Sequence, residues 1–155
     1  MRALSDAIVV AMPQVHREAL VPYSPAQMFA LVNDVERYPE FLPGCAAARI
    51  LSQDEQSMQA QLTLAKGGFQ QSFTTENRWQ APDYLTMKLA EGPFKFLNGE
   101  WRFVALGDAG CRISLKVDFE FTSMLAGIAF GPAFQRLMLS LVDAFQQRAR
   151  EVYRD

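Results

Sequence analysis

The final segment of the chain constrains the fold most strongly. When residues 123–153 are placed at about 100° per residue, one face is almost entirely apolar and the opposite face is polar. The apolar face consists of Phe130, Phe134, Leu137, Leu141, Phe145, Ala149 and Val152. A helix of this length measures about 45 Å, so it needs an equally long apolar surface to pack against.

The preceding part of the chain is predicted to supply this surface as an antiparallel sheet. Between the first two strands, Ser24, Pro25 and Gln27 form a helix-start pattern, and a second short helix is predicted over residues 36–42. Strands joined by short turns predict an α+β fold, in which a sheet of about seven strands curves around the C-terminal helix. Alternating apolar and polar residues place the strands at 14–21, 49–51, 58–64, 69–79, 84–91, 94–106 and 112–121.

Length and charge indicate one domain that does not bind DNA. The domain is predicted over residues 12–155, and residues 1–11 are predicted to be a disordered N-terminal extension. The net charge is −2 and the pI is near 5.4, so the chain as a whole has no electrostatic reason to attract nucleic acid.

Cysteine usage and apolar runs predict a cytoplasmic protein. Cys45 and Cys111 lie in separate segments without metal-site spacing, which is typical of free thiols in a reducing compartment. The longest apolar run, residues 124–134, has 11 residues and contains two glycines and a proline, so it is too short to span a bilayer.

Few residues are arranged for catalysis. His16, the only histidine, has no serine or cysteine motif tied to it, which favours a half-exposed strand residue over a general base. Asp118 and Glu120 alternate with inward aromatic residues, so solvent exposure is favoured over a catalytic carboxylate pair. Nothing near Cys45 indicates a reactive thiolate. We therefore predict a protein that is not an enzyme and requires no cofactor or metal.

Binding of a hydrophobic ligand fits the composition better. Twelve phenylalanines, seven methionines and two tryptophans exceed what filling the core of a chain this size requires, and methionine lines adaptable apolar pockets. The alternative is that these residues form a closed core. The predicted ligand-binding residues are Phe73, Met87, Phe96, Trp101, Phe103, Phe119, Phe134, Leu141 and Phe145, together with Arg148.

Two features depart from a simple amphipathic helix. Arg148 falls in the apolar arc, so it must reach solvent, pair with a carboxylate such as Glu100, or donate a hydrogen bond to a polar ligand group. Residues 124–134 are predicted either as the buried start of the helix or as a mobile lip that admits a lipid and contacts a membrane.

The chain contains a series of short motifs, which are Val21-Pro22-Tyr23-Ser24, Phe41-Leu42-Pro43-Gly44-Cys45, Phe73-Thr74-Thr75, Gly92-Pro93-Phe94, Asp118-Phe119-Glu120-Phe121 and residues 144–153. In this order and spacing they resemble the START-like (polyketide-cyclase-like, SRPBCC) family with its helix-grip fold. Within it the chain is similar to the bacterial RatA-type ribosome-association toxins and to the ubiquinone-binding START proteins of mitochondria. The resemblance covers about residues 12–153, and Pro132 departs from it because a proline interrupts helical hydrogen bonding.

The resemblance implies two functions. The first, which we predict, is binding of ubiquinone or a related isoprenoid quinone between sheet and helix without turnover, in support of respiration and with transient contact to the inner membrane. The alternative is a toxin that binds the large ribosomal subunit, blocks its association with the small subunit and is paired with a cognate antitoxin. For that function a local basic patch is available in Arg17, Arg37, Arg49, Lys66 or Lys95.

Overall fold

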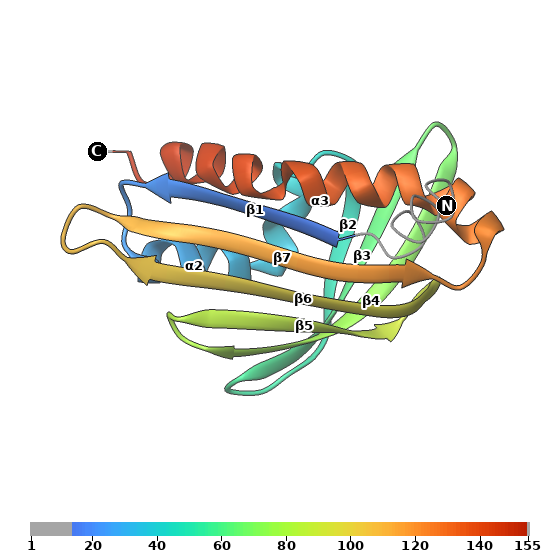
Figure 1. The fold of residues 1–155 in the computed structure, drawn as a ribbon, viewed down its shortest axis with the longest axis horizontal. Coiled ribbons are helices and arrows are strands. Elements are labelled where there is room, and N and C mark those ends of the chain that lie inside the picture. Colours follow the sequence, from blue (N-terminus) through green and yellow to red (C-terminus); the bar gives the residue numbers. More distant parts are fainter. Residues whose placement is uncertain (1–13, 155) are drawn as a thin grey trace, which may run out of the picture.

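The long C-terminal helix is present as α3 (Met124–Val152) and runs along one side of a curved sheet (Figure 1). The computed structural model describes residues 14–154. Ser123 caps the helix by accepting a hydrogen bond from the Ala126 N–H at 3.0 Å. The helix is continuous through Pro132. By length and composition α3 could cross a membrane, a test that long core helices also pass.

The sheet contains seven antiparallel strands in the order β1-β7-β6-β5-β4-β3-β2. Strands β2 to β7 form a continuous meander, and β1 adds the edge strand next to β7. This architecture confirms the predicted α+β helix-grip fold. The strands are β1 (Gln14–Val21), β2 (Cys45–Gln53), β3 (Ser57–Lys66), β4 (Phe69–Gln80), β5 (Tyr84–Glu91), β6 (Phe94–Ala105) and β7 (Cys111–Phe121).

Two short helices connect β1 to β2. In α2 (Pro25–Asn33), Ser24 and Gln27 form the predicted capping box. The segment predicted as a second helix is the 3-10 helix η1 (Val35–Glu40), which accommodates Pro39. Strand β2 is longer than predicted, because its alanine-rich start carries no apolar–polar alternation. The predicted extension over residues 1–11 lies outside the described residues.

Helix α3 is fixed to the sheet by an aromatic cluster. The ring of Phe134 lies 4.8 Å from that of Phe119, 4.9 Å from Phe94 and 5.6 Å from Phe73, between ring centroids. Closer to the start of α3, Phe121 packs edge-on against Phe130, with 6.0 Å between the ring centroids. The cluster therefore joins the first half of the helix to strands β4, β6 and β7.

We expect Phe134→Ala to lower the free energy of unfolding by about 3–5 kcal/mol, because it empties the centre of this fully buried cluster. Leu139→Ala, on the same helix but 42% exposed, is the control and should cost less than about 0.5 kcal/mol. Urea unfolding measures both. Similar losses in the two variants would contradict the assignment of Phe134 as the anchor of α3.

Candidate functional site

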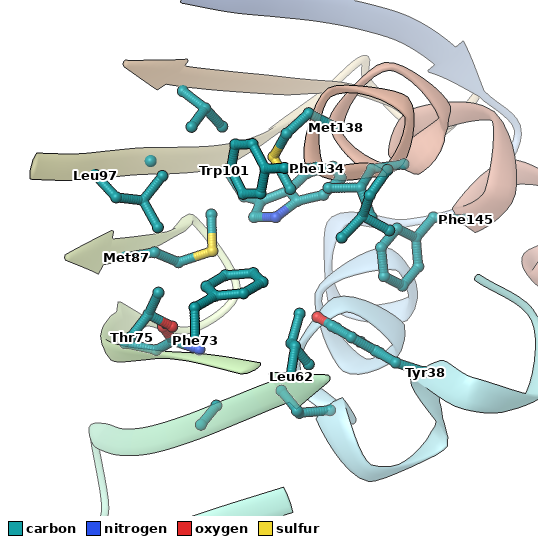
Figure 2. A pocket seen from close by; sticks show the side chains of 17 residues that line it. Tyr38, Leu62, Phe73, Thr75, Met87, Leu97, Trp101, Phe134, Met138 and Phe145 are labelled. Carbon is teal, nitrogen blue, oxygen red and sulfur yellow. The ribbon is translucent and has the colours of Figure 1, made fainter. Parts of the chain in front are cut away.

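A small apolar cavity lies between the inner face of the sheet, η1 and the middle of α3 (Figure 2). Its volume is about 50 Å³. Strands β3 to β7 supply one wall, and α3 supplies the opposite one. The lining residues are Val35, Tyr38, Ala60, Leu62, Phe73, Thr75, Asn77, Met87, Leu97, Gly99, Trp101, Val117, Phe134, Leu137, Met138, Leu141 and Phe145.

Six of the predicted ligand-binding residues line this cavity, and four do not. The six are Phe73, Met87, Trp101, Phe134, Leu141 and Phe145. Phe103 and Phe119 are buried in the surrounding core, where Phe103 packs edge-on against Phe29. Phe96 is only half-buried and does not line the cavity, because a register shift between Phe94 and Phe96 interrupts the alternation along β6.

Arg148 does not line the cavity either. Its guanidinium donates a hydrogen bond to Glu40 at 2.7 Å and lies 4.9 Å from the ring centroid of Phe41. Glu40 also accepts a hydrogen bond from Arg37 at 2.9 Å. The partner is therefore Glu40 of η1 and not Glu100, and the arginine fastens the C-terminal half of α3 to η1. This position gives no support to a hydrogen bond between Arg148 and a ligand in the cavity.

Three polar side chains in the cavity wall were missed by sequence reasoning. Tyr38 donates a hydrogen bond to the carbonyl of Val32, and complete burial raises the pKa of its phenol. The hydroxyl of Thr75 donates to Oδ1 of Asn77 at 2.7 Å. The signal was present in β4, where Phe73, Thr75 and Asn77 occupy alternate positions and therefore share the inner face.

The cavity has no acid–base pair. Among its lining residues there is no Asp, Glu, His, Lys or Arg. Outside it, His16 is exposed on β1 beside Glu18 at 3.3 Å, and burial raises the pKa of the Cys45 thiol to about 11. Within residues 14–154 no cluster of candidate metal ligands is found. The cavity lining therefore offers apolar contacts and a few neutral hydrogen-bonding groups to a ligand.

The cavity is smaller than a typical ligand site. Pockets for small molecules usually enclose about 300–1,000 Å³, so a ligand of that size would enter only if side chains moved. Met87 is an adaptable part of the lining, and its methyl group fills the space above Gly99: a Cβ on Gly99 would lie 2.6 Å from Met87 Cε. The structure is therefore close to a closed core, which the sequence analysis gave as the alternative to a ligand pocket.

The start of α3 contains both buried and exposed apolar side chains. Phe130 and Phe134 are buried, whereas Met124, Leu125 and Ile128 are 82%, 78% and 67% exposed. The first turns of the helix therefore carry an exposed apolar tip, defined as Met124, Leu125 and Ile128, outside the aromatic cluster.

Residues 21–146 match the family described as polyketide cyclase / dehydrase and lipid transport. The chain belongs to this family. Over 144 residues it is 47% identical to the ribosome association toxin RatA of Escherichia coli, covering 93% of this chain and 91% of that protein. It is 28% identical over 138 residues to the mitochondrial coenzyme Q-binding protein coq10 of Schizosaccharomyces pombe, covering 84% and 83%.

Solved structures of other proteins share the fold. The ZhuI aromatase/cyclase from Streptomyces aligns with a TM-score of 0.79 at 17% identity, covering 92% of this chain and 96% of that one. Identity this low shows the fold alone. The START-like assignment made from the sequence motifs is confirmed.

We expect the contact between Glu40 and its two arginines to make stability depend on pH. Hydrogen bonds from Arg37 and then Arg148 hold the pKa of Glu40 below its ordinary value of 4.5. A lowered folded-state pKa stabilises the protein above pH 4.5, and that contribution disappears as the pH falls through the folded value. Wild type should therefore exceed Glu40→Gln in stability at pH 7, and the difference should be smaller at pH 3.

Urea unfolding at the two pH values measures this difference. Glu36→Gln is the matched control, because Glu36 lies exposed in the same helix and makes no ion pair with any described residue. A Glu40→Gln effect of equal size at pH 3 and pH 7 would contradict an ionic role for this contact.

Proposed function

We propose that this protein associates with the ribosome and acts as a toxin of translation. The observation that carries the proposal is the 47% identity, over nearly the full length of both chains, to the ribosome association toxin RatA. The small volume of the cavity is compatible with it, because docking on a ribosome uses the surface and requires no change inside the protein. The binding site we propose is the large ribosomal subunit, where the protein would block association with the small subunit.

The outer face of the sheet is the surface that we propose for ribosome contact. Lys88 on β5 and Arg112 and Lys116 on β7 are exposed there, and none makes an ion pair with a described residue. Unpaired cations are available to phosphates, and such contacts dominate nucleic-acid affinity. This surface, defined as Lys88, Arg112 and Lys116, is called the basic outer face.

The five cations that the sequence analysis named as a local basic patch are less suitable for phosphate contact. Three of them face carboxylates: Arg17 lies 4.0 Å from Asp143, Lys95 lies 2.9 Å from Glu120, and Arg37 is bound to Glu40. Arg49 and Lys66 are exposed but lie in β2 and at the end of β3, which are distant from β7 in the strand order.

We expect wild-type protein to co-sediment with large ribosomal subunits and to reduce subunit association in sucrose gradients. Changing Lys88, Arg112 and Lys116 together to Glu should weaken this binding. Each lost phosphate contact lowers the slope of log affinity against log salt by about 0.7–0.9, so the slope should fall by about 2–3.

The control triple variant Arg49→Glu, Lys66→Glu, Arg150→Glu makes the same change in net charge at positions outside β5 and β7. It should bind nearly as wild type does. Equal loss in both variants would contradict the basic outer face as the docking surface. Failure of the wild type to co-sediment would contradict ribosome association itself.

A second candidate function is non-enzymatic binding of a hydrophobic ligand, with ubiquinone or another isoprenoid quinone as the compound proposed. It is supported by the apolar cavity, the family's description as lipid transport and the more distant similarity to a coenzyme Q-binding protein. Such binding would support respiration.

We place the protein in the cytoplasm, with the apolar tip available for transient contact with the inner membrane while a lipid is exchanged. A cognate antitoxin is a further proposed partner for the toxin function.

Mass spectrometry of an organic extract tests the second candidate. Protein incubated with quinone-containing vesicles and reisolated should carry quinone, and Val117→Phe should carry much less, because Val117 lines the cavity and is 1% exposed. Val104→Phe, on the half-exposed outer face of β6, is the matched control and should load normally. A wild-type extract without quinone after this incubation would exclude quinone as the ligand.

A further inference from the structure

The cavity contains a buried amide whose hydrogen-bonding capacity is half used. Asn77 is 4% exposed and Thr75 is 7% exposed. Because the Thr75 hydroxyl donates to Oδ1 of Asn77, it satisfies the amide oxygen and fixes the side-chain orientation. The bond from Thr75 is the only side-chain hydrogen bond found for Asn77 within the described residues, and both residues line the cavity. An NH2 group on a cavity wall can donate to a ligand.

Strand register places this donor beside the adaptable part of the wall. On the inner face Asn77 lies opposite Met87, and Met87 lies opposite Gly99. Displacement of the Met87 side chain from the space above Gly99 would open room directly next to the Asn77 amide. Figure 2 shows the thioether of Met87 between the β4 wall and the indole of Trp101.

A second donor faces the same space. The indole N–H of Trp101 donates to no described residue, and Figure 2 shows its nitrogen on the side of the pocket. The wall thus presents two N–H donors in an otherwise apolar lining, without a charged side chain among its residues. Such a site favours an uncharged molecule with an acceptor oxygen, since a charged one would be left unpaired.

We propose that the cavity recognises a carbonyl oxygen of an uncharged, mostly apolar ligand, with the Asn77 NH2 group as the hydrogen-bond donor and Thr75 as the residue that orients it. The Met87 side chain moves aside to admit the carbonyl-bearing ring or head group of the ligand. This inference rests on the second candidate function and deepens it, because it names the polar contact that selects among hydrophobic ligands.

Two probes with the same alkyl chain test the proposal. Decylubiquinone carries carbonyl oxygens, and decylbenzene carries none. Quenching of tryptophan fluorescence by the quinone, and competition by the hydrocarbon, give the two affinities. Asn77→Leu should weaken decylubiquinone binding about tenfold, the value of one lost hydrogen bond, and should leave decylbenzene binding within about twofold. Asn98→Leu, exposed on β6, is the matched control and should change neither.

A vibrational measurement on the wild type does not depend on the variant's folding. The carbonyl stretching band of bound, carbonyl-labelled decylubiquinone should lie at lower wavenumber than in hexane, because a hydrogen bond weakens the C=O bond. In Asn77→Leu the band should return toward its hexane position. An unshifted band in the wild type would overturn the proposal, as would equal weakening of both probes in Asn77→Leu.

The results separate this inference from the functions on which it builds. Saturable binding of both probes with no effect of Asn77→Leu would overturn the carbonyl contact and leave the second candidate standing. If neither probe binds, both the carbonyl contact and the second candidate function are overturned. Ribosome co-sedimentation of Asn77→Leu should equal that of wild type in every case, since Asn77 is buried.

Discussion

The packing of α3 against the inner face of the sheet is the interaction on which the rest of the structure depends. Phe134 lies at the centre of the contact, among rings from β4, β6 and β7. Farther along the helix, Phe145 packs edge-on against Trp101 at 5.4 Å, and Arg148 reaches Glu40. The cavity exists between these two anchored ends, so its size is set by how closely the helix approaches the sheet.

This arrangement separates two kinds of function in space. The interior offers an apolar lining, the N–H donors of Asn77 and Trp101 and an adaptable methionine, which suit a neutral ligand with an acceptor oxygen. The exterior offers unpaired cations on the outer face of the same sheet, which suit phosphate contact. Because successive residues of a strand point to opposite faces, Met87 and Lys88 are neighbours in sequence and belong to different sites. Ribosome association and ligand binding can therefore coexist in one domain.

The polar elements of the interior were the least accessible to sequence reasoning. Thr75 and Asn77 occupy core-facing positions at which an apolar residue is expected, and their meaning depends on the hydrogen bond between them. The partner of Arg148 could not be assigned from sequence, because Glu40 is 108 residues away. For Phe96, the register shift beside Phe94 breaks the alternation on which the prediction relied.

The sequence by itself determined the order and type of the elements, since these follow from local periodicity: the amphipathic stripe of α3, the alternation along β7 and the capping box at Ser24. It also determined six of the cavity-lining residues, because large apolar side chains on inward positions meet at the centre of such a fold. Only the tertiary structure decided that the cavity is nearly closed, that Arg148 binds η1, and that an amide donor faces the interior. These depend on distances between segments remote in the chain, and packing fixes such distances to a precision that periodicity does not carry.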